Sequence, residues 1–102
     1  MEVELIWEEI TKDQDGFAVK KKRAVSAFAE EKTVKRSEAY EAMRSGVSVQ
    51  TVLEIRQEDW EETMHIVNGK KEYARKVQFD GCEYDIVRAY KKNKAKIELS
   101  CG

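Results

Sequence analysis

The sequence has no proline, and its 102 residues include only five glycines and two cysteines. Cys82 and Cys101 match neither the ligand spacing of a metal site nor a disulfide framework, so we expect reduced, buried or half-buried thiols. No stretch approaches the roughly 20 apolar residues of a membrane-spanning helix. The first ten residues also lack the basic and apolar regions of a signal peptide. We therefore expect a soluble protein without a membrane partner that stays in the compartment where it is made.

An excess of one charge sign is also missing. The 19 Lys and Arg residues nearly balance 20 Asp and Glu residues, which gives a net charge of −1. This balance argues against a uniformly basic nucleic-acid-binding protein, although it is compatible with local basic patches. With 38% charged and 41% hydrophobic residues, the chain is expected to form a single domain, 1–102, with a charged surface and a modest core.

Alternation of apolar and polar residues predicts strands along most of the chain. The second strand is long enough to form two parts bent relative to one another. Asp13-Gln14-Asp15-Gly16 and Lys91-Lys92-Asn93-Lys94 are turn sequences. The predicted strands are Val3–Ile10, Phe17–Ala29, Val49–Arg56, Val77–Phe79, Cys82–Ile86 and Ile97–Cys101.

The clearest local signal is the dipeptide Asp80-Gly81. Asp-Gly favours the type I′ turn of a two-residue hairpin loop. Such a loop places Phe79 opposite Cys82 and Val77 opposite Tyr84, so the apolar residues of both strands share one face.

One segment changes period from 2 to 3.6. Ala39, Ala42 and Met43 follow a helical spacing, Ser37 is a suitable N-cap, and Gly46 is placed to end the helix. A helix of about ten residues is marginal alone, so it must dock on the sheet. The expected fold is mainly β. It is a small closed or curled barrel of about six strands with one short α-helix between the second and third.

Three stretches in this order resemble the phage head–tail joining family, the head-closure or stopper proteins of long-tailed phages and prophages. They are AFAEEKTVKRSEAYEAMRSGVSVQTVLEIRQEDW, VQFDGCEYDIVRAY and the terminal IELSC. The resemblance extends over nearly the whole chain. It implies a structural protein of the virion, made in the bacterial host cytoplasm and located at the head–tail interface. Such a protein would join the portal and adaptor after DNA packaging, close the channel and dock the tail.

The resemblance also implies a homo-oligomeric ring in the virion, and we expect a monomer in isolation. The expected mobile plug or contact loops match Thr11–Arg23 and Glu58–Lys71, the second of which is predicted as a long loop. The candidate interface residues are Tyr40, Arg44, Trp60, Met64, His65 and Ile66. The apolar residues among them either mark an interface or fold over the barrel end and become buried.

A basic run of four residues has three readings: a solvated strand, a contact with the adaptor, or a contact with channel DNA. The run is Lys20, Lys21, Lys22 and Arg23. His65 is the only histidine, and no set of ligands or catalytic partners assembles around it. We therefore expect neither an enzyme nor a metal or other cofactor. Two alternatives stay open: a tail-completion protein, and a small-barrel nucleic-acid-binding module with aromatic residues beside basic ones.

Overall fold

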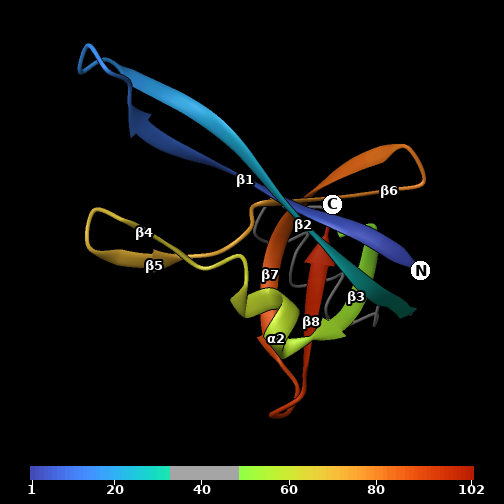
Figure 1. The fold of residues 1–102 in the computed structure, drawn as a ribbon. Helices are drawn as coiled ribbons and strands as arrows, with labels where there is room; N and C mark the ends of the chain where they lie inside the picture. The colour runs from blue at the N-terminus through green and yellow to red at the C-terminus, as the bar shows by residue number, and fades with distance from the viewer. Residues whose placement is uncertain (33–48) are drawn as a thin grey trace.

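A computed structural model describes residues 1–32 and 49–102. Six antiparallel strands close a barrel in the order β1-β2-β3-β8-β7-β6 (Figure 1). This confirms the mainly β fold and the six-stranded barrel. The barrel strands are β1 (Glu2–Lys12), β2 (Ala18–Lys32), β3 (Thr51–Arg56), β6 (Lys76–Phe79), β7 (Cys82–Lys91) and β8 (Lys96–Cys101).

The core lies inside the barrel and is built from alternate positions of its strands. Val3 and Leu5 face inward from β1, Leu53 and Ile55 from β3, and Leu99 from β8. Each is at most 1% exposed, which is the outcome that the alternating pattern predicts. Burial of these aliphatic side chains supplies the main favourable free energy of folding.

The Asp80-Gly81 prediction is confirmed in detail. Asp80 and Gly81 have φ of 51° and 73°, the positive values that a type I′ turn requires. Phe79 pairs with Cys82 and Val77 pairs with Tyr84 in the β6–β7 ladder. Val77 is fully buried, and Phe79 and Tyr84 pack against the core.

The helix differs from the prediction. Among the described residues the α-helix is α2 (Gln57–Glu61), which follows β3 rather than lying between the second and third strands. The segment for which the sequence predicts a helix, 37–46, lies outside the described residues. The segment Glu58–Lys71 is also not one long loop. It contains most of α2 and then β4 (His65–Val67), which pairs with β5 (Lys70–Glu72) in a separate two-stranded sheet.

The first two strands extend well beyond the barrel. β1 pairs with β2 along its whole length, from Glu2↔Phe28 to Lys12↔Ala18, but it pairs with β6 only at Glu4–Ile6. β2 reaches β3 only from Ala29 onward. Residues 7–23 therefore form a two-stranded projection, here called the arm (Figure 1). The radius of gyration, 14.8 Å, exceeds the roughly 13 Å of a compact domain of this size.

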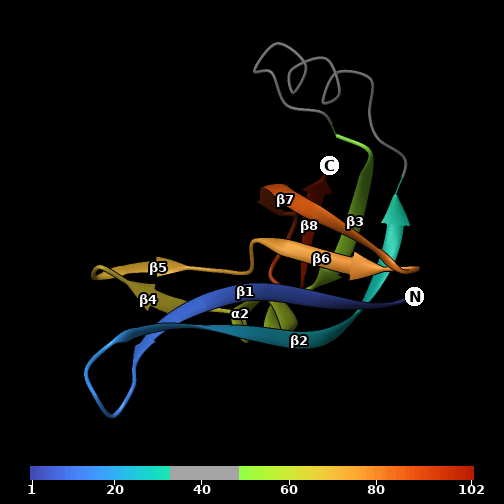
Figure 2. The same ribbon diagram turned by 90° about the horizontal axis from the view of Figure 1, so that it is seen from above.

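The arm corrects the prediction of a loop at Thr11–Arg23. Only the few residues between Lys12 and Ala18 form a turn, and strands continue on both sides of it. β2 is one continuous strand that changes partner from β1 to β3 near Ala29. The β4–β5 hairpin is the second projection, and it leaves the barrel on the same side as the arm (Figures 1 and 2).

Candidate functional site

The tip of the arm is closed by an aspartate. The Asp13 carboxylate oxygen accepts hydrogen bonds from the backbone amides of Asp15 (3.0 Å) and Phe17 (2.8 Å). Gly16 has φ of 81°, a conformation that glycine adopts without steric cost. The sequence prediction of a turn at residues 13–16 is confirmed, and the turn fixes the register of the arm.

The base of the arm contacts the β4–β5 hairpin through two rings. Trp7 of β1 stacks on His65 of β4, with ring centroids 5.5 Å apart and an interplanar angle of 8°. His65 Nδ1 donates a hydrogen bond to the carbonyl oxygen of Thr63 (2.9 Å). Because Thr63 is buried, this bond ties the imidazole to the body of the domain.

Glu9 links the two strands of the arm. The Trp7 indole N–H donates to one Glu9 carboxylate oxygen (3.0 Å), and Arg23 Nε donates to the other (3.4 Å). These contacts, the Trp7 hydrogen bond first, lower the pKa of the Glu9 carboxyl group. Glu9 therefore stays ionised and holds Arg23 at the base of the arm.

The predicted basic run lies on β2 of the arm, and its four residues are all exposed. Its cross-strand neighbours include Glu8, which faces Lys22, and Glu9, which faces Lys21. Arg23 forms an ion pair with Glu9, whereas none of the described residues forms an ion pair with Lys20, Lys21 or Lys22. The arm thus carries three lysine charges that the described part of the chain does not neutralise.

The apolar candidates of the second projection divide into buried and exposed residues. Trp60 is 5% exposed, stacks on Tyr73 at 5.2 Å and belongs to the core, so it does not offer an interface in this state. Met64 and Ile66 are 39% and 60% exposed, while His65 is half-buried against Trp7. The reading of burial within the domain therefore holds for Trp60, and Met64 and Ile66 stay candidates for an interface. Tyr40 and Arg44 lie outside the described residues.

A cleft of about 990 Å³ separates the arm from the β4–β5 hairpin. Glu8 and Ile10 line it from β1, and His65, Ile66 and Asn68 line it from the hairpin. Lys76 contributes to the wall and forms an ion pair with Glu83 (3.2 Å), which raises the pKa of the lysine. Exposed apolar side chains, Ile10 and Ile66, are present on both walls.

Several surface residues of this site escape the sequence analysis. Ile10, Phe17 and Val19 are 71%, 69% and 43% exposed on the arm. The strand pattern gives no reason to single them out, because it assigns apolar residues to the core. The β4–β5 hairpin has a signal, the dipeptide Asn68-Gly69, with φ of 52° and 78°. Asn-Gly is the strongest short hairpin signal between two strands, and it could have revealed this projection.

The two cysteines are both free. Cys101 is buried as expected, but Cys82 is exposed, which corrects the expectation of two buried or half-buried thiols.

Within residues 1–32 and 49–102, no group of three or more His, Cys, Asp or Glu residues could hold a metal ion. No helix in these ranges has the length and apolar character that crossing a membrane requires.

Comparisons with protein-family models, curated proteins and solved structures find no match to this chain. Its function must therefore be inferred from its own residues and their arrangement.

Proposed function

We propose that this protein is a head–tail joining protein of a long-tailed phage or prophage. It would bind the portal and adaptor after DNA packaging, close the channel as a ring, and present a docking surface to the tail. In this role it catalyses no reaction and needs no cofactor. The proposal starts from the sequence resemblance over nearly the whole chain.

The observation that carries the proposal furthest is the pair of β-hairpins that project from one side of a closed barrel (Figure 2). A closed barrel has no free edge within its ring of strands and serves as a rigid body. The arm and the β4–β5 hairpin extend from this body and carry exposed apolar residues, among them Phe17 and Ile66. Exposed apolar groups on a structured projection are typical of contacts with other proteins.

The alternative of a nucleic-acid-binding module is less well supported. Such a module needs aromatic rings exposed beside basic side chains. Of the aromatic residues on β6 and β7, Phe79 and Tyr84 stack on each other at 4.9 Å and pack against the core, whereas Tyr90 is exposed. On the arm, Phe17 is the exposed aromatic residue among the described ones. A role on the tail side of the junction uses the same kind of surface, and it is an outcome of the experiment below.

The test is an assembly experiment with phage heads that contain DNA but lack this gene product. Purified protein is added, and DNA retention, tail attachment and density below the portal are measured. Restored retention and tailing with a new ring of density support head closure. Restored tailing of heads that already retain DNA would assign the protein to the tail side. Absence of any binding by the folded protein would overturn the proposal.

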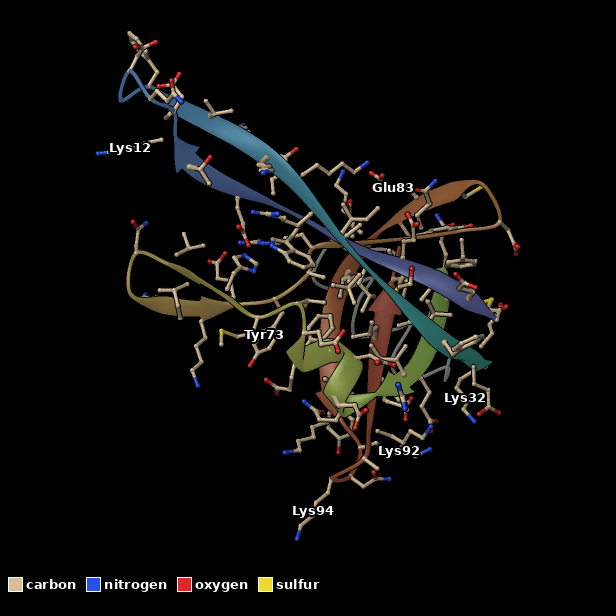
Figure 3. All side chains as sticks on the ribbon, viewed as in Figure 1. Lys12, Lys32, Tyr73, Glu83, Lys92 and Lys94 are labelled. Atoms are coloured by element: carbon tan, nitrogen blue, oxygen red, sulfur yellow. The ribbon has the colours of Figure 1, made fainter. Side chains whose placement is uncertain are left out.

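Matched variants locate the surface in the same experiment. Lys12 lies near the far end of the arm, and Lys94 lies in the turn after β7 at the opposite end of the molecule (Figure 3). Phe17→Ser removes an exposed apolar residue from the arm, and Lys94→Ser serves as the control. We expect Phe17→Ser to reduce assembly and Lys94→Ser to retain it.

A further inference from the structure

The arm has an open strand edge on β1. Met1 and Ala29 exchange two backbone hydrogen bonds, and the Asp13 amide donates to the carbonyl of Phe17. Hydrogen bonding alternates in an antiparallel pair, so the odd-numbered residues of β1 bond to β2. The amides and carbonyls of even-numbered residues face the other side, where Arg75 N donates to Ile6 O (2.9 Å).

Beyond Ile6, no described strand continues on this side of β1. The backbone groups of Glu8, Ile10 and Lys12 therefore have no strand partner on this side in the described ranges, and Glu8 and Ile10 line the cleft. Unpaired strand edges of this kind are templates for another strand. A two-stranded ribbon is also only marginally stable by itself.

The opposite side of the arm has a second open edge, on β2. The same alternation directs the backbone groups of Lys20, Lys22 and Ala24 away from β1. The pairing of β2 with β3 begins only at Ala29, so this edge has no strand partner among residues 1–32 and 49–102 either. Each chain thus carries two complementary edges on one projection.

Charge distinguishes the two edges. Lys20, Lys21 and Lys22 of β2 form no ion pair in the described part of the chain. The β1 edge instead carries one negative and one positive side chain, Glu8 and Lys12. Glu8 lies opposite Lys22 of its own arm and lines the cleft with it, but it forms no ion pair among the described residues. Opposite charges set the orientation and register of a contact. The β2 edge of one chain therefore suits the β1 edge of another.

We propose that neighbouring copies of this chain join through their arms, with the β2 edge of one copy pairing with the β1 edge of the next. β1 and β2 are antiparallel within an arm. Adding β2 of one copy to β1 of the next therefore continues an antiparallel sheet with all arms pointing the same way. The contact is heterologous, and a closing rotation generates a ring. This inference rests on the ring assembly proposed above and identifies its interface.

The test is disulfide crosslinking between two populations of chains, each with one introduced cysteine. Both carry Cys82→Ser, which removes the exposed native thiol. One population has Glu8→Cys. The other has a cysteine at position 20, 22 or 24, or at the control positions 21 and 23. Mixing two populations excludes a bond between positions 8 and 22 of the same chain, which are cross-strand partners.

In the proposed sheet, even-numbered residues of β2 lie opposite even-numbered residues of the next β1. We expect position 8 to crosslink several times faster with one of positions 20, 22 and 24 than with either control. Equal rates at even and odd positions would overturn the proposal, as would crosslinking of Glu8→Cys chains only with themselves. A complete lack of crosslinked dimer at raised protein concentration would also overturn it.

Proline variants test the backbone contact separately. The Ile10 amide faces the open edge, so Ile10→Pro removes no hydrogen bond to β2 but prevents addition of a strand. Ile10→Ala retains the amide and is the matched control, with Lys20→Pro as a second blocking variant on the other edge. We expect both proline variants to fold, judged by their thermal transitions, and to lose the crosslink. Persistence of the crosslink in both folded variants would contradict edge pairing.

The assembly experiment separates this interface from the proposed function. If wild-type protein restores phage heads without the even–odd crosslinking pattern, the interface is wrong and head closure stands. If the pattern forms but heads are not restored, the copies join as proposed and the function lies elsewhere. Binding of the monomer to duplex DNA, lost when Lys20–Arg23 are replaced by Ser and without a crosslink, would assign the arm to nucleic acid instead.

Discussion

Trp7 and His65 stack almost parallel at 5.5 Å, and their contact joins the arm to the β4–β5 hairpin. The two residues are far apart in the sequence and belong to different sheets. Their rings form the base of the cleft between the projections, so the stack helps to set the angle at which the arm leaves the barrel.

Loss of the His65 ring should loosen the arm. Stacked ring pairs contribute about 0.5–1.5 kcal/mol beyond the area that they bury. We expect His65→Ala to lower the free energy of unfolding by about this amount and to speed exchange of the Glu9 and Thr11 amides, which bond to β2. Urea denaturation and hydrogen exchange measure the two effects. Ile66→Ala, at a neighbouring exposed position, should change neither, and similar losses in both variants would show that the stack has no special role.

Thr63 is a second test of how the β4–β5 hairpin is attached. Its buried hydroxyl donates to the carbonyl of Trp60 (2.7 Å) and accepts from the amide of Ala74 (3.1 Å). Thr63→Val leaves the Ala74 amide without its acceptor, so we expect a loss of about 1–3 kcal/mol in the free energy of unfolding. Thr63→Ser should retain most of that stability.

Thr51 provides a contrasting control for the same substitution. Its hydroxyl is buried and has no hydrogen-bond partner among residues 1–32 and 49–102, so Thr51→Val removes a polar group that these residues leave unsatisfied. Chemical denaturation should show unchanged or increased stability. If Thr51→Val lowered the free energy of unfolding as much as Thr63→Val does, the fit of the new side chain rather than hydrogen bonding would explain both results.

The sequence predicts the barrel well because the barrel depends on a local rule. Alternation at Val3, Leu5 and Trp7 and the Asp80-Gly81 turn each specify a face or a register from neighbouring residues. The prediction of a long loop at Glu58–Lys71 is wrong because this rule needs longer elements: α2 has only five residues and β4 only three. Elements of that length offer too few repeats for a period to be recognised.

The candidate site was predicted only in part, because exposure depends on where strands end relative to one another. Ile10 and Val19 have the apolar character of core residues, yet both are exposed on the arm. The arm begins where the pairing of β1 with β6 ends, at Ile6. Trp60 is a residue type that is common at interfaces, but it lies on α2 and packs in the core. These outcomes depend on tertiary contacts that local patterns do not contain.

The Glu54 carboxylate should contribute stability that depends on pH. It accepts a hydrogen bond from Lys92 Nζ (3.2 Å) and forms an ion pair with Lys32 Nζ (3.6 Å). The Lys92 hydrogen bond is the main cause that lowers the pKa of Glu54, and the charges of both lysines add to it. The contribution is therefore present above the ordinary pKa of 4.5 and is lost as the pH falls through the lower folded value.

We expect Glu54→Gln to lower the free energy of unfolding at pH 7 by about 0.2–1 kcal/mol, because both lysine partners are partly exposed. The difference from wild type should shrink toward zero in acid. Denaturation curves between pH 7 and pH 2 measure it. Glu30→Gln is the control, since that side chain is 71% exposed and pairs only with Lys32 among the described residues. A pH-independent difference at Glu54 would exclude the ion pairs as its cause.

The two cysteines should differ strongly in reactivity. Burial raises the pKa of Cys101 to about 12, and Cys82 is exposed. Only the thiolate is an effective nucleophile, so iodoacetamide at pH 8 should modify Cys82 readily and Cys101 only after unfolding. Mass spectrometry of the Cys82→Ser variant follows Cys101 alone, with and without urea. Equal labelling rates in both conditions would show that the barrel opens at β8 without global unfolding.

The raised Cys101 pKa also gives a direction for the stability at high pH. The folded state holds the thiol proton more tightly than the unfolded chain does. The contribution of this group is therefore complete below the ordinary pKa of 9.0 and is lost as the pH rises from there toward about 12. Cys101→Val removes the titrating group, so its stability should fall less steeply than that of wild type over this range. Parallel decline in the two proteins would mean that the alkaline loss comes from other groups.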